Sequence, residues 1–361
     1  MASTETTSPN VFDLTRQLVA IPSVSFEEQE IVDFLENRLT ALPWLNTVRI
    51  GDNLIARTDG GKNVRVLLGG HTDTVPPQGN TQVKVKDDVL WGVGSADMKG
   101  GIASMLSLAE TLPETAVEVT YVFYAREEVA YEENGLLEID SETPELLDAD
   151  LAILGEPTSG NIEAGCQGTM RFVLELAGER AHTARPWMGR NAIHRLHTVL
   201  KAIDEYIPRS PIIEGCQFRE ALQVVNVEGG VAGNVIPDLS RLTINHRVAP
   251  DKDLIYAENE IRNFFKPYME KSDQLTLVDA APPAKPGLAN PMLQSMIQNH
   301  DLKVEAKLGW TDVAFFDQRG VPAVNFGPGD ATLAHTKEER VQKASIEGCF
   351  KALKQMLESG I

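Results

Sequence analysis

Several apolar segments of the sequence are each followed by a side chain that can bind a metal ion. The residues in these positions are His71, Glu128, Glu156 and His335. A carboxylate at the end of a buried strand is unfavourable unless a cation compensates its charge. Asp97, in the glycine-rich stretch GVGSADMKGG, adds a further carboxylate just before a helical pattern. Imidazole and carboxylate groups together suit zinc, manganese or cobalt, so the pattern predicts a metal centre.

Taken one at a time, these residues also have ordinary structural explanations. His71 and Asp73 could form a hydrogen-bonded pair, and Asp97 could cap a helix. The adjacent acids 127–128 could be a solvated strand end, and Glu156, which precedes a proline, could be a turn residue. The repeated placement after separate apolar segments favours metal binding, because carboxylates gathered at strand ends would repel one another without cations.

The number of candidate ligands fits a centre of two divalent ions, with zinc expected and cobalt or manganese as substitutes. Asp97 is expected to bridge the two ions. His71 and Glu156 would complete one site, and Glu128 and His335 the other. Two ions about 3.5–4 Å apart lower the pKa of a bound water and polarise a carbonyl, so the predicted reaction is hydrolysis of an amide.

Two further acids near these ligands have expected roles of their own. Asp73 is expected to orient the imidazole of His71 through its second nitrogen. Glu127, the carboxylate left beside the water, is the expected general base. The rival chemistry is a serine or cysteine nucleophile, but the sequence shows no Gly-x-Ser-x-Gly motif and no cysteine in a convincing catalytic setting.

Strand and helix patterns alternate in the N-terminal and C-terminal parts of the chain. Strands are expected at 47–50, 53–57, 64–68, 117–125, 151–154 and 321–326, and helices at 10–20, 25–42, 98–112, from 291, and at 344–357. Ser25 and Glu28 form a capping-box pattern at the start of the second helix. The alternation predicts an α/β domain whose mostly parallel sheet has helices on both faces. Ligands of such sheets bind at the carboxyl ends of the strands.

The middle of the chain has a different pattern. Alternating strands are expected at 169–177, 222–228 and 240–248, and helices at 189–207 and 254–269. This pattern is typical of an α+β unit with a largely antiparallel sheet. It ends at the proline-rich stretch 280–287, which predicts a linker. We therefore expect one domain formed by residues 1–167 and 283–361, with a second domain, 168–282, inserted between its parts.

Length, charge and cysteine content limit the organisation and partners of the protein. A chain of 361 residues exceeds what one hydrophobic core usually serves, and a formal net charge of −19 argues against nucleic acid or a membrane as partner. No segment approaches the about 20 apolar residues that span a bilayer, and residues 1–10 lack the pattern of a signal peptide. Cys166, Cys216 and Cys349 match no disulfide framework. We expect a cytoplasmic protein with reduced, mostly buried thiols.

Seven motifs identify a resemblance to a known family. The motifs are GGHTDTVPP, GVGSADMKGG, AREE, GEPT, GERAHTARP, GNVIPD and GPGDATLAH. In this order they resemble those of the zinc-dependent aminoacylase and carboxypeptidase-type metallopeptidases. The resemblance covers nearly the whole chain and implies a phosphorylase/hydrolase-like catalytic domain with an inserted ferredoxin-like lid domain that forms a homodimer. It implies the same five ligands, base and orienting aspartate, and a cis peptide bond between Asp97 and Met98.

The resemblance also implies residues that contact the substrate. His182 matches a lid histidine that reaches the active site of the partner subunit and helps to hold the tetrahedral oxyanion. Asn234 in GNVIP matches a substrate-binding residue that is also donated across the dimer, and Arg247 matches an arginine that pairs with a substrate carboxylate. Arg185, Thr311 in GWTDV and Gly327 in FGPGD are further expected contacts. The stretches YEENGL and HTKEE depart from better-studied members of the family.

These expectations together predict an amidohydrolase that acts on a small N-acyl amino acid. Glu156, where carboxypeptidases of the family often carry aspartate, favours the deacylase side. The acyl group removed could be one that carries a free carboxylate, such as a succinyl group, or a plain acetyl group. The non-enzymatic alternative is a family member that has lost its metal and serves as a binding or scaffold dimer. The presence of all five ligands argues against this alternative.

Overall fold

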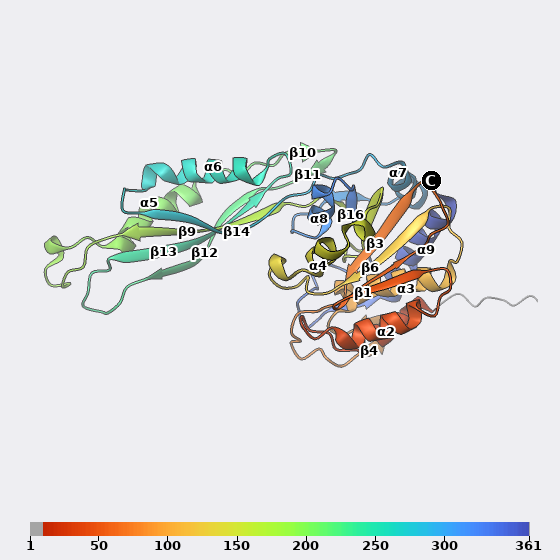
Figure 1. Ribbon diagram of the computed structural model, residues 1–361. Coiled ribbons are helices and arrows are strands. Elements are labelled where there is room, and N and C mark those ends of the chain that lie inside the picture. Colours follow the sequence, from red (N-terminus) through yellow and green to blue (C-terminus); the bar gives the residue numbers. More distant parts are fainter. Residues whose placement is uncertain (1–9, 361) are drawn as a thin grey trace, which may run out of the picture. The chain divides into compact units, whose positions relative to one another are not determined.

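The computed structural model describes residues 10–360, which form two compact units. The first unit contains the chain up to Ala164 together with Pro286–Glu305 and the part from Phe315 onward. The second unit contains Gly165–Lys285 and Ala306–Ala314. Figure 1 shows the elements of each unit. The expectation about a signal peptide concerns residues 1–10, nearly all of which lie outside the described residues.

The main sheet of the first unit has the strand order β1-β2-β6-β3-β7-β16-β8-β15. Its strands are β1 (Asn46–Ile50), β2 (Asn53–Arg57), β3 (Arg65–His71), β6 (Glu118–Tyr124), β7 (Leu151–Leu154), β8 (Ile162–Ala164), β15 (Val304–Ala306) and β16 (Ala323–Asn325). The central strands β6, β3, β7 and β16 are parallel to one another. The flanking strands β1, β2 and β8 pair antiparallel.

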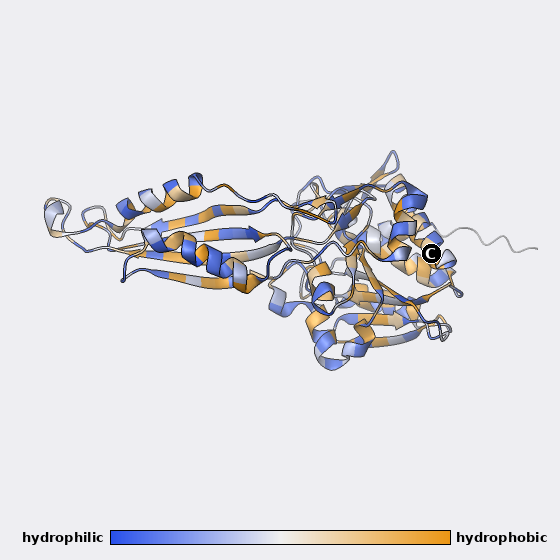
Figure 2. Cartoon of the chain, turned by 90° about the horizontal axis from the view of Figure 1, so that it is seen from above, coloured by the Kyte–Doolittle hydropathy of each residue, from blue (hydrophilic) through white to orange (hydrophobic). Residues whose placement is uncertain are grey.

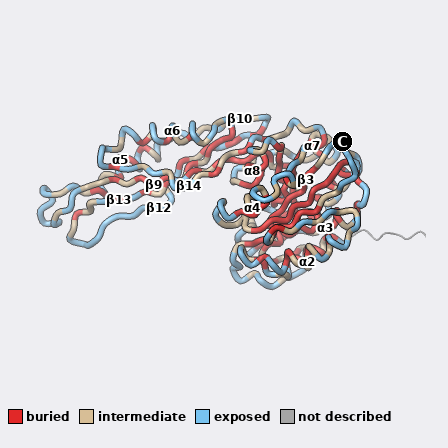
Figure 3. The backbone as a smooth tube through the Cα atoms, viewed as in Figure 1, coloured by how far each residue is buried: buried red, intermediate tan, exposed pale blue. Residues whose placement is uncertain are grey.

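The central strands are buried on both faces. Every residue of β6, β7 and β16 is buried, as is every residue of β3 after Arg65. Successive side chains of a strand point to opposite faces, so this burial means that both faces of the sheet are covered. The strands around β3 are red in the burial view (Figure 3), and much of the interior of this unit is orange in the hydropathy view (Figure 2). The predicted mixed α/β fold with a mostly parallel sheet is confirmed.

The helices of the first unit are α1 (Val11–Val19), α2 (Gln29–Leu39), α3 (Gly100–Thr111), α4 (Gly135–Glu142), α7 (Pro291–His300) and α9 (Lys343–Ser359). Helix α8 (Val313–Gln318) begins in the segment 306–314 of the second unit and continues into the first. Helix α3 contacts β3 and β6 and also packs against α1 and α9. A smaller sheet joins β17 (Arg340–Gln342), β5 (Val89–Trp91) and β4 (Lys84–Lys86).

The second unit has the chain order β9-α5-β12-β13-α6-β14 and the sheet order β12-β13-β9-β14. Its elements are β9 (Gly168–Ala177), α5 (Ala192–Asp204), β12 (Ala221–Gly229), β13 (Leu239–Val248), α6 (Leu254–Phe265) and β14 (Gln274–Ala281). All pairings are antiparallel. This is the ferredoxin-like arrangement, which was predicted. Alternate residues of β9 and β13 pack with both helices in one core.

Two local expectations need correction. Of the linker expected at 280–287, the first two residues belong to strand β14 (Gln274–Ala281), which pairs with β9, whereas 282–287 lie outside the helices and strands. The capping box at Ser25 and Glu28 is absent, because α2 begins at Gln29 and its N-cap makes no side-chain hydrogen bond. The Ser25 hydroxyl instead donates to the carboxylate of Asp73 at 2.7 Å.

Two expectations about composition hold for the described part of the chain. Cys166, Cys216 and Cys349 are buried and form no disulfide. No helix between residues 10 and 360 has the length and apolar character needed to cross a membrane.

Candidate metal centre

The candidate ligands lie beyond the carboxyl ends of neighbouring parallel strands. β3 ends at His71, β6 is followed by 127–128, and β7 is followed by Glu156. Because β6, β3 and β7 are adjacent and parallel, their carboxyl ends meet at one edge of the sheet. The buried apolar sequences of these strands therefore fix where the polar side chains emerge.

Asp97 lies in the irregular turn Ser95–Lys99, which precedes α3. The turn begins after Gly94, whose φ of 78° is in the left-handed region that favours glycine. The peptide bond between Asp97 and Met98 is cis, as the resemblance implied. The Asp97 side chain lies opposite the end of β3, within 3.2 Å of the imidazole of His71.

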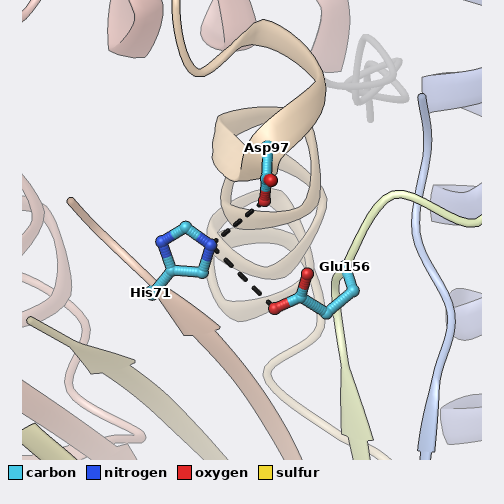
Figure 4. Close-up of side chains that lie close together, drawn as sticks. All are labelled: His71, Asp97 and Glu156. Carbon is cyan, nitrogen blue, oxygen red and sulfur yellow. Dashed lines mark hydrogen bonds and ion pairs between the residues drawn. The ribbon is translucent and has the colours of Figure 1, made fainter. Parts of the chain in front are cut away.

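The two carboxylate oxygens of Asp97 face different imidazoles. Oδ1 lies 3.2 Å from Nε2 of His71, and Oδ2 lies 3.4 Å from Nε2 of His335. Nε2 of His71 is also 3.9 Å from Oε1 of Glu156, as Figure 4 shows. Nε2 of His335 is 2.8 Å from Oε1 of Glu128. Asp97 is thus shared between two groups, each with one histidine and one further carboxylate.

Both groups have the donor set of a divalent-metal site. In each group, one ligand atom per residue can be chosen so that all three lie within 4.8 Å of one another. One imidazole nitrogen and two carboxylate oxygens are ligands that zinc accepts, and they leave positions open for water or substrate. His71, Glu127 and Glu128 form a further group of this kind, which brings the expected base to the same place.

The charges of this cluster are strongly coupled. Hydrogen bonds to Asp97 and Glu128 raise the pKa of His335 to about 10. Burial opposes the charged form of His71, but its bonds to Asp73 and Asp97 raise its pKa well above the usual value. Burial would raise the pKa of Asp97, yet the two imidazoles hold it well below its ordinary range. The carboxylates therefore favour protonation of both imidazoles, and a metal ion that binds here competes with these protons.

Asp73 makes more contacts than its expected role required. Nδ1 of His71 lies 3.0 Å from the Asp73 backbone oxygen and 3.4 Å from its Oδ1, which leaves Nε2 for Asp97 and Glu156. The Asp73 carboxylate also accepts hydrogen bonds from the backbone N–H groups of Glu127 at 3.0 Å and Glu128 at 3.1 Å. It therefore links the loop after β3 to the loop after β6.

The expected substrate contacts of the second unit fall at two ends of that unit. His182 forms an isolated bridge with Val235, and the Thr183 N–H donates to the backbone oxygen of Asn234. The Arg185 N–H donates to the backbone oxygen of His182, so these residues gather before the start of β13. Arg247 lies near the other end of β13, ten residues long.

Thr311 and Gly327, the other two expected substrate contacts, lie in different units. The backbone oxygen of Thr311 accepts a hydrogen bond from the Cys166 thiol, two residues before β9 begins, and Thr169 of β9 pairs with Arg247. Thr311 thus belongs to the Arg247 end of the second unit. Gly327 is in the first unit, where a Cβ atom would lie 2.2 Å from the Gly155 oxygen. The roles of all these residues toward a substrate remain predictions.

Two buried charged residues near Asp97 were missing from the sequence-based expectations. Glu339 accepts hydrogen bonds from the turn that carries Asp97, and burial raises its pKa to about 7. Lys99 donates from Nζ to the Ile21 oxygen at 2.7 Å, and burial lowers its pKa to about 7. Lys99 can be recognised in the sequence as a lone lysine at the start of an otherwise apolar helix. Glu339 lies beside another acid in HTKEER, and nothing in that stretch indicates that its side chain is buried.

Comparison with known proteins accords with this geometry. Residues 67–359 match the model of peptidase family M20/M25/M40, a range that includes every candidate ligand. The chain belongs to this family. It is a metal-dependent hydrolase, as the ligand pattern predicted.

Relatives of this M20 chain are similar over nearly their whole length. A protein of Mycobacterium tuberculosis named putative succinyl-diaminopimelate desuccinylase DapE is 46% identical over 96% of this chain and 97% of its own. Succinyl-diaminopimelate desuccinylase of Corynebacterium glutamicum is 41% identical over 95% of each chain. A tripeptidase from Staphylococcus aureus has the same fold, with a TM-score of 0.80 at 21% identity and 98% of each chain covered.

Proposed function

We propose that this M20 hydrolase cleaves N-succinyl-LL-2,6-diaminopimelate to succinate and LL-2,6-diaminopimelate, a reaction of lysine and diaminopimelate biosynthesis. The observation that carries the chemistry is the pair of histidine and carboxylate groups that share Asp97. The substrate follows from the relatives named succinyl-diaminopimelate desuccinylase, which align with almost the entire chain. Such a reaction belongs in the cytoplasm.

The proposed cofactor is a pair of zinc ions, for which cobalt or manganese can substitute. His71, Asp97 and Glu156 would hold one ion, and Asp97, Glu128 and His335 the other. When bound, the ions supply a water of lowered pKa and polarise the amide carbonyl. The ligand geometry supports this, because the two oxygens of Asp97 already face separate imidazoles.

Glu127 is the proposed general base. The Asp73 carboxylate fixes its backbone, and its own carboxylate lies within the ligand cluster. In this role Glu127 accepts a proton from the attacking water and returns it to the leaving amine, so that the C–N bond breaks with release of a neutral amino group. Asp73 holds His71 and the Glu127 loop in one arrangement during both transfers.

The second unit is proposed to act as a lid and to form a homodimer. His182, Arg185 and Asn234 lie at one end of that unit, whereas Arg247 and Thr311 lie at the end where the chain enters and leaves it. This separation supports a site to which two subunits contribute. His182 and Asn234 would serve the partner subunit's site, with His182 stabilising the oxyanion. Arg247 and Arg185 would pair with substrate carboxylates, and Gly327 would line the pocket.

A substrate panel tests the proposal. The full-length protein, freed of metal and then supplied with zinc, is assayed with succinyl-diaminopimelate and with N-acetylornithine. The carboxylate of the succinyl group should pair with a cationic side chain of the site. An acetyl group has no carboxylate and would leave that side chain unpaired, so kcat/KM should be at least about 100-fold higher for the succinyl substrate. Equal or greater activity on the acetyl substrate would make the protein a different deacylase. No zinc-dependent hydrolysis of either would reject the proposal.

A further inference from the structure

Glu339 is a buried carboxylate on the stretch that joins the His335 loop to β17. Its residue is only 1% exposed. Its backbone N–H donates to the Thr336 oxygen at 3.2 Å, and its backbone oxygen accepts from the Gly92 N–H at 3.3 Å. The backbone of Glu339 is therefore held on both sides, and its side chain enters the interior from a fixed position.

The side chain of Glu339 binds the backbone of the turn that carries Asp97. Its Oε1 accepts hydrogen bonds from the N–H groups of Ala96 at 3.0 Å and Asp97 at 3.1 Å. Asp97 has non-helical φ and ψ angles of −118° and 95°, and N–H groups at the start of a helix lack partners within it. A buried N–H group without an acceptor is unfavourable, so the carboxylate holds this turn in place.

Asp97 is the one residue that both histidine and carboxylate groups share within the described chain. A shift of its backbone would change its distances to His71 and His335 together. Glu339 follows His335 by four positions in the sequence. A single side chain thus connects the loop of one imidazole to the turn of the shared carboxylate.

Lys99 is a second buried ionisable residue, at the end of the turn that carries Asp97. Lys99 is 1% exposed and donates from Nζ to the Ile21 oxygen. A buried carboxylate is tolerated where hydrogen-bond donors surround it, and the N–H groups of Ala96 and Asp97 supply such donors here.

We propose that Glu339 is a positioning residue of the metal centre. Through the backbone of Asp97 it holds the shared carboxylate between the two imidazoles. Its side chain acts on the backbone of the turn and is not itself a ligand. The inference rests on the metal centre proposed above, and it assigns to Glu339 a role in ion affinity that is separate from binding the substrate.

The test compares variants that separate the position of the acceptor from its charge. Glu339→Gln keeps an oxygen at the end of the side chain but removes the charge, whereas Glu339→Asp keeps the charge but withdraws the oxygens by one methylene. Glu339→Leu removes both. Glu118→Leu is the matched control: Glu118 is also buried and accepts the Lys62 N–H at 2.9 Å, but it begins β6 at the end remote from the ligands.

Each metal-free, full-length protein is titrated with cobalt(II), and ion binding is followed by visible absorption. The Leu and Asp variants should bind cobalt about 10- to 100-fold more weakly. Their kcat at saturating cobalt should fall while KM stays close to that of the wild type. The Gln variant should recover most of the affinity. Glu118→Leu should lower the unfolding temperature without changing cobalt affinity or the spectrum.

Several results would overturn the role. Native cobalt affinity in the Leu variant would do so, and so would equal losses in the Gln and Asp variants or an equal loss in the Glu118 control. If Glu339→Leu does not fold, the comparison of Asp with Gln decides alone. A wild-type protein that takes up no cobalt would instead reject the metal centre itself, and the role of Glu339 with it.

Discussion

The Asp73 carboxylate accepts the backbone N–H of Glu127 at 3.0 Å. Asp73 also borders the second nitrogen of a candidate ligand, His71. One side chain therefore fixes the proposed base and a proposed ligand relative to each other. Replacing a side chain that orients a metal ligand typically lowers metal affinity or activity about 10- to 100-fold. A change at Asp73 should therefore affect both the proposed base and the proposed ligand.

Replacing Asp73 by asparagine should lower both activity and stability. The amide NH₂ group cannot accept a hydrogen bond, so at least one buried donor among Ser25, Glu127 and Glu128 loses its acceptor, at a cost of about 1–3 kcal/mol in unfolding free energy. The kcat should fall about 10- to 100-fold. Denaturant unfolding and steady-state kinetics provide the measurements. Ser25→Ala, which removes one donor but leaves the carboxylate, should have the smaller effect; the reverse order would contradict this account.

Glu127→Gln should abolish turnover without loss of metal. The amide keeps the size of the side chain but cannot take a proton from water, and positioned proton transfer contributes about 10²- to 10⁴-fold to rate. Metal content by elemental analysis should equal that of the wild type. A variant with wild-type kcat would show that another group is the base, and a variant without metal would show that Glu127 is a ligand.

The stability of the metal-free protein should depend on pH through His335. Its pKa is raised to about 10 in the folded chain, compared with 6.5 for the free side chain. The pairing with Asp97 and Glu128 therefore stabilises the folded state fully below about pH 6.5, and this contribution declines as the pH rises toward 10. Urea unfolding in the presence of chelator, compared between wild type and His335→Asn, measures the difference. A difference that grows with pH would have the wrong sign.

Gly327→Ala should disturb the loop that carries Glu156. A Cβ atom at this position would lie 2.2 Å from the Gly155 oxygen and 2.6 Å from the Glu156 oxygen, so the backbone must move. Both thermal stability and zinc affinity should fall. Gly348→Ala in α9 is the control, because nothing lies within 4 Å of its Cβ position and alanine favours a helix by about 0.5–1 kcal/mol. Equal behaviour of the two variants would contradict the steric argument.

The sequence locates most of the candidate ligands because strand burial determines where these side chains emerge. The apolar runs before His71, Glu128 and Glu156 form the expected parallel strands, and their ends meet at one edge. The capping-box pattern at Ser25 is local in sequence, whereas the acceptor of its hydroxyl, Asp73, is 48 positions away. No local pattern indicates the role of Glu339 either, because the backbone groups that it binds are more than 240 positions away in the sequence.

Other expectations depend on features that sequence patterns record weakly. Strand β14, QLTLVDAA, is an edge strand with most of its residues exposed or half-buried, so it lacks the apolar run that marked the central strands. The substrate roles of His182, Asn234 and Arg247 depend on a second subunit and a bound substrate. They therefore remain predictions that the resemblance supplies.

Counting the zinc ions bound per chain tests the central claim most directly. The metal-free wild-type protein and Asp97→Ala are each equilibrated with zinc, passed through a desalting column and analysed for metal content. Because Asp97 is shared by both groups, the account predicts two ions per wild-type chain and loss of both tight sites in the variant. Fewer than one ion per wild-type chain, or two ions retained by Asp97→Ala, would contradict it.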